Sequence, residues 1–421
     1  MANVSSSNGL EKYPKLRFPG FEGDWKSTLL ASIFSKITKK NTDGKITNVI
    51  CNSAKQGLIP QREYFDKEIA NSDNTGGYYI IEENDFVYNP RKSADAPYGP
   101  ISSYKYPDAG IVSPLYLCFR AKEEIIPSFF EWYFRSSAWH RYVYMSGDSG
   151  ARHDRVSIKD DTFFAMPINI PIADEQKHIA SFLDKIDLKI DKQRALVEAL
   201  KKYKRGLSDA IFDAIAKMET SIVVPFGSIL SILQNNTFSR DELFSSNDGV
   251  KNIHYGDVLI KYGAVLNMSS TQVPTIKPGK DLGKYSSSSY LLNGDVVFAD
   301  TAEDYSVGKA TEIYNADGLA ILSGLHTIPC RSNTAFAPMY LGYYFNSGYF
   351  KSQIYPMIQG TKVSSISKSE IIKTTLLIPP YSTQEKIAAV LRKLDARIEI
   401  EEKTVLELIQ VKCGVLQQLF I

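Results

Sequence analysis

Cysteine is scarce in this sequence, and its few copies stand apart. The four cysteines, Cys51, Cys118, Cys330 and Cys413, form no Cys-x-x-Cys pair. This spacing argues against a zinc ribbon, a redox dithiol or a disulfide framework. The five histidines show no HxxxH or other spacing typical of metal ligands. No metal site is therefore predicted in the chain.

Long apolar runs are also missing. No stretch of about 18 apolar residues suggests a membrane span, and the opening MANVSSSNGLEKYPK lacks the basic-then-apolar pattern of a signal peptide. We therefore expect a cytoplasmic protein with no membrane partner. The formal net charge is only +2. Such a charge neither indicates nor excludes a nucleic-acid partner, because the clustering of basic residues decides that question.

What the sequence does contain is a long internal repeat. Residues 171–212 and 379–420 align without a gap at an offset of 208 residues. In both copies, apolar residues recur at alternating steps of four and three, the spacing of a coiled-coil helix. We expect two long helices that pair antiparallel. The seam residues predicted to pack the helices are Ile179, Leu183, Ile186, Ile190, Lys204, Ile387, Leu391, Leu394, Ile398 and Glu401.

Polar residues interrupt both helical seams at matching places, Gln193/Glu401 and Lys204/Lys412. If the helices pair about a pseudo-twofold axis, Glu401 is expected to face Lys204. Polar seam residues often fix the register of a coiled coil at some cost in stability. The alternative is that these side chains face solvent near frayed parts of the seam.

The stretches before the two helices are of a different kind, with short apolar runs broken by turn residues, and they predict β-rich globular domains. They repeat weakly, and PSFFEWYFRSSAW and PMYLGYYFNSGYF are expected to form equivalent aromatic helices. The predicted fold class is α+β, with two globular domains that alternate with two long helices. The expected boundaries are a first domain at 1–170, a central helix at 171–220, a second domain at 221–378 and a C-terminal helix at 379–421.

These features resemble the specificity subunit of a type I restriction-modification enzyme. The resemblance rests on the opening PKLRFPGFEGDW, on the Pro-x4-Gln-x2-Ile-Ala-x2-Leu pattern in both repeats, on the endings RGLSDAIF and CGVLQQLF, and on YLLNGDVVFADTAEDYSVGKA. It implies two target-recognition domains that each read one half of a gapped, asymmetric DNA sequence. The conserved helices would act as a spacer and, through the seam residues named above, dock two methyltransferase subunits. Restriction would recruit translocase-nuclease subunits.

The same resemblance implies that this chain is non-catalytic and needs no cofactor of its own. Its partner subunits are expected to use S-adenosylmethionine, ATP and Mg, and to carry out adenine methylation and restriction of double-stranded DNA.

DNA contacts are expected from Lys, Arg, Asn, Gln, Ser and Thr on exposed loops. The candidates in the first domain are Lys39, Lys40, Asn89, Arg91, Lys92, Tyr98, Arg152, His153 and Arg155. Those in the second domain are Lys261, Tyr262, Thr301, Lys309, Thr361, Lys362 and Ser364. Gly150 and Gly360 occupy equivalent places in the repeat, which indicates a shared loop. Asp300, Glu303 and Asp304 could accept hydrogen bonds from cytosine N4, although acidic loop residues are more often turn formers.

Two other classes stay open: an orphan coiled-coil DNA-binding scaffold, and the specificity region of a fused methyltransferase-nuclease. The segment at 378–381, IPPY, resembles the (Asn/Asp)-Pro-Pro-(Tyr/Phe) motif of adenine methyltransferases. However, Ile378 cannot accept a hydrogen bond from the target amino group. Glu175–Gln176–Lys177 resembles part of a nuclease metal site, but its repeat partner is Thr383–Gln384–Glu385 and it opens a predicted helix.

Overall fold

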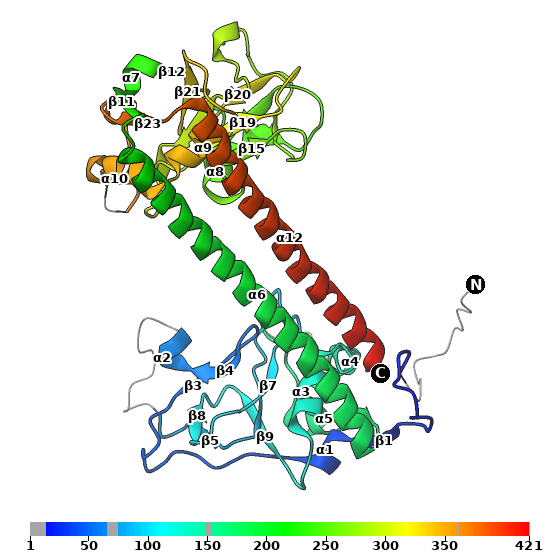
Figure 1. Cartoon of the computed structure of the whole chain (residues 1–421). Coiled ribbons are helices and arrows are strands. Elements are labelled where there is room, and N and C mark those ends of the chain that lie inside the picture. The colour runs from blue at the N-terminus through cyan, green and yellow to red at the C-terminus, as the bar shows by residue number, and fades with distance from the viewer. Residues whose placement is uncertain (1–13, 65–74, 148–153, 361, 421) are drawn as a thin grey trace, which may run out of the picture. The chain divides into compact units, whose positions relative to one another are not determined.

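The computed structural model describes residues 14–64, 75–147, 154–360 and 362–420. The chain forms two compact units: unit 1 consists of residues 1–193 and 404–421, and unit 2 of residues 194–403. The two predicted long helices are α6 (Ala173–Ala216) and α12 (Tyr381–Leu419), and each contributes residues to both units (Figure 1). No helix in the described ranges is long and apolar enough to cross a membrane.

The globular part of unit 1 contains an antiparallel sheet of four short strands in the order β2-β9-β6-β7. Its strands are β2 (Phe34–Lys36), β6 (Phe86–Tyr88), β7 (Ile101–Ser103) and β9 (Leu117–Ala121). Two-stranded ladders pair β1 (Lys26–Leu29) with β10 (Pro167–Ile170), β3 (Ile50–Ser53) with β4 (Gly57–Pro60), and β5 (Tyr79–Ile81) with β8 (Gly110–Val112). The short helices are α1 (Leu30–Ile33), α2 (Gln61–Tyr64), α3 (Pro127–Arg135), α4 (His140–Ser146) and α5 (Asp160–Phe164).

Unit 2 contains a five-stranded sheet in the order β12-β21-β17-β19-β15 and a four-stranded sheet in the order β13-β16-β14-β20. The first has β12 (Leu230–Ile232), β15 (Val265–Asn267), β17 (Val296–Ala299), β19 (Ala310–Tyr314) and β21 (Thr327–Ser332). The second has β13 (Leu243–Phe244), β14 (Lys251–Ile253), β16 (Thr275–Ile276) and β20 (Ile321–Ser323). Ladders pair β11 (Ile222–Pro225) with β23 (Thr375–Ile378) and β18 (Thr301–Ala302) with β22 (Ser364–Ser365). The short α-helices are α7 (Phe226–Ile229), α8 (Tyr255–Ile260), α9 (Tyr340–Phe345), α10 (Gly348–Ile354) and α11 (Lys368–Ile372).

The two units share one plan. The order β2-β9-β6-β7 in unit 1 matches β12-β21-β17-β19 in unit 2, and every one of these pairings is antiparallel. An ion pair with a buried carboxylate recurs as well, since Arg120 donates to Asp85 at 2.6 and 2.7 Å and Arg331 donates to Asp295 at 2.9 and 2.6 Å. The weak sequence repeat of the globular parts is therefore a repeat of structure.

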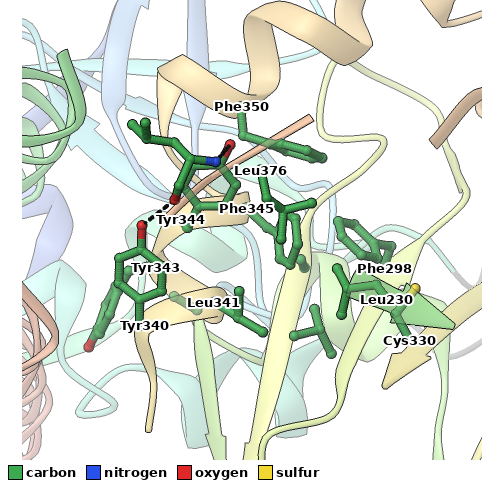
Figure 2. Close-up of a cluster of buried hydrophobic side chains, with 14 of the residues drawn as sticks. Leu230, Phe298, Cys330, Tyr340, Leu341, Tyr343, Tyr344, Phe345, Phe350 and Leu376 are labelled. Atoms are coloured by element: carbon green, nitrogen blue, oxygen red, sulfur yellow. Dashed lines mark hydrogen bonds between the residues drawn. The ribbon is translucent and has the colours of Figure 1, made fainter. Parts of the chain in front are cut away.

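Aromatic side chains fill the core of each unit, and both predicted aromatic helices are present. In unit 1, α3 packs against the sheet, and the ring centroids of Phe34 and Phe130 lie 5.2 Å apart. In unit 2, Phe345 of α9 lies 4.8 Å from Phe298 and 4.7 Å from Phe350 by ring centroid (Figure 2). Each aromatic residue buries roughly 150–250 Å², so these side chains serve packing rather than base contact.

The Pro-x4-Gln pattern fixes the turn into each long helix. Gln176 Nε2 donates to Pro171 O at 2.9 Å, and Gln384 Nε2 donates to Pro379 O at 2.9 Å. Both carbonyls follow a strand, β10 or β23, so the glutamine ties the end of the strand to the first turn of the helix. The repeated motif is thus explained by local geometry.

Within each unit, α6 and α12 run antiparallel and share a matched ion pair. In unit 2, Lys204 pairs with Asp395 and Lys201 pairs with Glu402 at 2.9 Å. Lys204 Nζ also lies 5.4 Å from the ring centroid of Tyr343, a cation–π geometry.

Unit 1 repeats this arrangement at equivalent positions. Lys412 pairs with Asp187, and its Nζ atom lies 5.0 Å from the ring centroid of Trp132. Trp132 and Tyr343 belong to the equivalent helices α3 and α9, so each globular part helps to set the register of its own pair of helices.

The expected pairing of Lys204 with Glu401 is wrong. Lys204 pairs with Asp395. Glu401 is buried and forms an ion pair with Arg397 of the same helix. Matched breaks in two seams do not fix the axial offset of the helices. That offset depends on contacts outside the seam, such as the 2.8 Å hydrogen bond that Tyr343 donates to Asp395.

Candidate nucleic-acid interface

Two loops that carry predicted DNA-binding residues, one at 89–92 and one at 154–155, meet in unit 1. Lys92 N donates to Asp154 O at 2.8 Å, and Arg91 forms an antiparallel β-bridge with Arg155. Between these loops and the turn of the β3–β4 hairpin lies a hollow of about 880 Å³. Its lining includes the polar residues Lys55, Gln56, Asn89, Arg91, Lys92 and Arg155.

Backbone contacts hold the loop at 89–100 in one shape. Asn89 Oδ1 accepts from Arg91 N at 3.1 Å, and Asn89 N donates to Pro100 O at 3.0 Å. Gly99 has a φ of +85°, and a Cβ atom there would lie 2.2 Å from Asn89 O. Only glycine fits this position, so the loop presents its basic side chains from a fixed backbone.

The hollow carries hydrogen-bond donors that the described part of the chain leaves free. The side chains of Arg91 and Lys92 are exposed and have neither a hydrogen bond nor an ion pair with described residues. The Nε atom of Arg155 is buried without a hydrogen-bond partner there, and the Asp154 carboxylate lies 3.9 Å from it. Guanidinium groups bind phosphate oxygens or guanine O6 and N7 bidentately. The hollow therefore suits an anionic polymer with acceptor-rich edges.

The corresponding loops of unit 2 also meet. The β18–β22 ladder sets Thr301 opposite Ser365. Gly360 has a φ of +106°, and a Cβ atom there would lie 2.0 Å from Val363 O. This close approach explains the glycine on the Gly360 side of the predicted shared loop, whereas Gly150 lies outside the described residues.

The two surfaces differ in charge. The loop between β17 and β19 of unit 2 carries Asp300, Glu303 and Asp304, whereas the loop between β6 and β7 of unit 1 carries Arg91 and Lys92. Asp300 accepts from Thr301 Oγ1 at 2.8 Å, and its carboxylate lies 3.4 Å from His326 Nδ1.

Among the described residues, the remaining candidates of unit 1 do not line the hollow. Lys39 and Lys40 are exposed, and their backbone pairs beside β5, with Ile80 N donating to Lys39 O at 3.0 Å. Tyr98 is half-buried against His140, with 4.6 Å between the ring centroids. Arg152 and His153 lie outside the described residues.

Two candidates of unit 2 do not present their functional groups to solvent. Tyr262 is 3% exposed, and this burial raises the pKa of its hydroxyl. Lys309 is half-buried and donates to Leu259 O at 2.8 Å. Burial, followed by repulsion from Lys351 and Lys204, lowers the pKa of Lys309. The burial of Tyr262 argues against its predicted contact with DNA.

The other candidates of unit 2 remain accessible. Lys261 is exposed and pairs with Asp257 at 3.1 Å. Lys362 is exposed, Thr301 and Ser364 are half-buried at the β18–β22 ladder, and Thr361 lies outside the described residues.

The hairpin turn at 54–56 lines the hollow but is absent from the DNA-binding residues predicted from the sequence. Lys55 and Gln56 line the hollow, and Lys55 pairs with Asp95 at 3.6 Å across it. The signal available was the stretch NSAKQGLIP, in which a polar turn ending in Gly57 precedes an apolar strand. Nothing in that signal indicates that the turn comes near residues 89–92.

The motifs that resemble catalytic sites have structural partners. The buried carboxylate of Glu175 accepts two hydrogen bonds of 2.8 Å from Arg17. Pro379 lies between β23 and α12, where its carbonyl accepts the hydrogen bond from Gln384. Among the described residues, no group of three or more His, Cys, Asp and Glu side chains is arranged to hold a metal ion.

Comparisons with known proteins bear on this geometry. The family model described as the type I restriction modification DNA specificity domain matches twice, at residues 23–202 and 237–410. A comparison with curated protein sequences found no match.

Among solved structures, one similar chain comes from a structure described as "Structural basis underlying complex assembly and conformational transition of the type I R-M system". Its TM-score is 0.62 and its sequence identity 17%, and the match covers 96% of this chain and 99% of that chain. Another is the HsdS subunit from Thermoanaerobacter tengcongensis, with a TM-score of 0.51 and 16% identity over 96% of this chain and 97% of that chain. At these identities, the likeness concerns the fold.

Proposed function

Because the chain belongs to the type I restriction-modification DNA specificity family, we propose that its two units read the two halves of one gapped, asymmetric DNA target. The chain is the DNA specificity subunit of such a system, and it binds DNA and assembles with other subunits. One observation carries the proposal: equivalent loops meet in both units. Arg91 pairs with Arg155 in unit 1 and Thr301 with Ser365 in unit 2, and the neighbouring sheets have the same strand order. The framework repeats while the loop side chains differ, which suits a target with two different halves.

We assign the division of labour along the chain by residue ranges. The target-recognition domains are 1–170 and 221–378, and the spacer helices are 171–220 and 379–421. Major-groove readout needs exposed donors and acceptors at fixed positions, which the loops provide. Half-site spacing then follows from the helices, since a rigid spacer fixes the separation of two readers.

The seam residues hold the helices, so the docking surface for other subunits is on exposed helical positions. Ile179, Leu183, Ile190, Ile387, Leu391, Ile398 and Glu401 are buried, and Ile186, Leu394 and Lys204 are half-buried. In unit 2, the exposed apolar side chains on these helices include Leu196, Tyr203 and Ile400. In unit 1, they include Leu188, Leu406 and Val411. Exposed apolar side chains on an otherwise polar helix favour a helical partner.

Two methyltransferase subunits are the partners that fit two such surfaces, with restriction-translocase subunits added for cleavage. In this proposal, the chemistry belongs to those partners, which use S-adenosylmethionine, ATP and Mg. This chain supplies sequence readout, itself non-catalytic and without a cofactor.

The test replaces Leu196 and Tyr203 together by glutamate. Two charges in a docking surface are expected to weaken association with the methyltransferase subunit at least about tenfold, and adenine methylation falls with it. DNA binding by the chain alone is expected to stay unchanged. Association is measured by titration of the purified subunits, with Lys202→Glu on the same helix as the control. Adenine methylation by the chain alone, or full association of the double variant, contradicts the proposal.

A further inference from the structure

The loop between β17 and β19 of unit 2 has an exposed tip at residues 303–305. Tyr305 is 86% exposed, more than any other large hydrophobic residue described. Its hydroxyl and the exposed Glu303 carboxylate have no hydrogen bond or ion pair with the described residues. Both side chains are therefore accessible to a ligand.

The backbone at the tip forms a defined turn. Asp304 Oδ1 accepts from Ser306 N at 2.8 Å, and the hydrogen bonds from Ser306 lower the pKa of Asp304. Gly308 has a φ of +78°, and a Cβ atom there would lie 2.4 Å from Ile354 Cδ1. Asp304 is therefore a turn former, whereas Glu303 and Tyr305 project from the turn it shapes.

The charge of the tip limits what it can touch on DNA. A free carboxylate is repelled by phosphates, so Glu303 gains nothing by lying along the backbone. The groups on a base edge that it can accept from are the exocyclic amino groups of cytosine N4 and adenine N6 in the major groove. An exposed tyrosine ring can make an apolar contact with the C5-methyl group of a thymine, which a base pair also presents in the major groove.

We infer that Glu303 and Tyr305 form the base-reading tip of unit 2. Glu303 accepts a hydrogen bond from a cytosine or adenine amino group, and the ring of Tyr305 contacts the C5-methyl group of a neighbouring thymine. This inference rests on the proposed function. The equivalent loop of unit 1 instead carries Arg91 and Lys92, and its aromatic residue, Tyr98, packs on His140. The two units therefore read by opposite chemistry, with donors in unit 1 and an acceptor in unit 2.

The test compares Glu303→Gln, Tyr305→Ala and Tyr305→Phe in the complete complex of the chain with its methyltransferase subunit. The probes are two duplexes: the target found by mapping methylated adenines, and the same duplex with the unit 2 half scrambled. Glu303→Gln and Tyr305→Ala are each expected to lower affinity for the true target by about 5- to 100-fold, with affinity for the scrambled duplex unchanged. Tyr305→Phe keeps the ring and is expected to bind like the wild type. Glu399→Gln, an exposed acid on α12, is the control.

Each outcome separates the inference from its premise. If Glu303→Gln tightens binding to both duplexes equally, Glu303 only repels DNA and the inference is overturned. It is also overturned if both tip variants discriminate between the duplexes as the wild type does, and the proposed function then stands. If the wild-type complex does not discriminate between the duplexes, the proposed function fails together with the inference.

Discussion

Reversing the charge of Arg91 and Arg155 together is expected to lower the affinity of the chain for its DNA target by about a hundredfold or more. The two residues face each other across a β-bridge and line the same hollow, and Arg155 Nε has no hydrogen-bond partner among the described residues. A guanidinium that contacts a base edge or phosphate contributes about 1–3 kcal/mol, and two reversals remove both contacts and add repulsion. The measurement is equilibrium binding of the purified chain at fixed salt.

A salt titration of the variants Arg91→Ala and Arg155→Ala shows whether each residue contacts a phosphate or a base. A lost phosphate contact reduces the slope of log affinity against log salt by about one, whereas a lost base contact changes the affinity without changing the slope. Lys122→Glu, which alters an exposed lysine that does not line the hollow, serves as the control. Wild-type affinity in the double-reversal variant, across the titration, contradicts the assignment of the hollow as a DNA surface.

Replacing Asp295 by alanine is expected to destabilise unit 2 by about 2–4 kcal/mol, because its buried carboxylate accepts charge-assisted hydrogen bonds from the partly exposed Arg331 and a hydrogen bond from a backbone amide. Asp295 is 2% exposed and accepts from Leu292 N at 2.7 Å as well as from the Arg331 guanidinium at 2.9 and 2.6 Å. Its loss leaves the Leu292 amide without that partner and Arg331 without its carboxylate, next to the strand that leads into the base-reading loop.

Hydrogen exchange followed by mass spectrometry locates the effect within the chain. For Asp295→Ala, faster exchange is expected in residues 194–403. The matched variant Asp85→Ala, which loses the equivalent pair with Arg120, is expected to act in the globular part of unit 1 instead. Glu370→Ala breaks an exposed pair with Lys373 and is expected to cost less than about 1 kcal/mol. A similarly small effect of Asp295→Ala contradicts the structural role of the pair.

The sequence predicted the helices and the repeated domains because both leave periodic signals. The four-and-three spacing marked Leu183 and Leu391, and both are fully buried. The aromatic segments became α3 and α9. These features depend on local sequence patterns, and each pattern occurs in both copies of the repeat.

The partners of individual polar side chains could not be predicted in the same way. Lys204 pairs with Asp395, which also accepts a hydrogen bond from Tyr343 of the globular part, and not with Glu401. The burial of Tyr262 depends on which distant elements cover its side chain. The turn at Lys55 and Gln56 joins Arg91 only through a contact between segments far apart in the sequence. Such choices are set by tertiary packing, which a single sequence does not display.

The central claim is that two different readers on one chain recognise the two halves of one target. Mapping every methylated adenine in cells that carry this chain with its methyltransferase subunit tests that claim most directly. The expected result is one gapped motif with two unlike halves, and Glu303→Gln relaxes only one of them. A continuous palindromic motif would contradict the account.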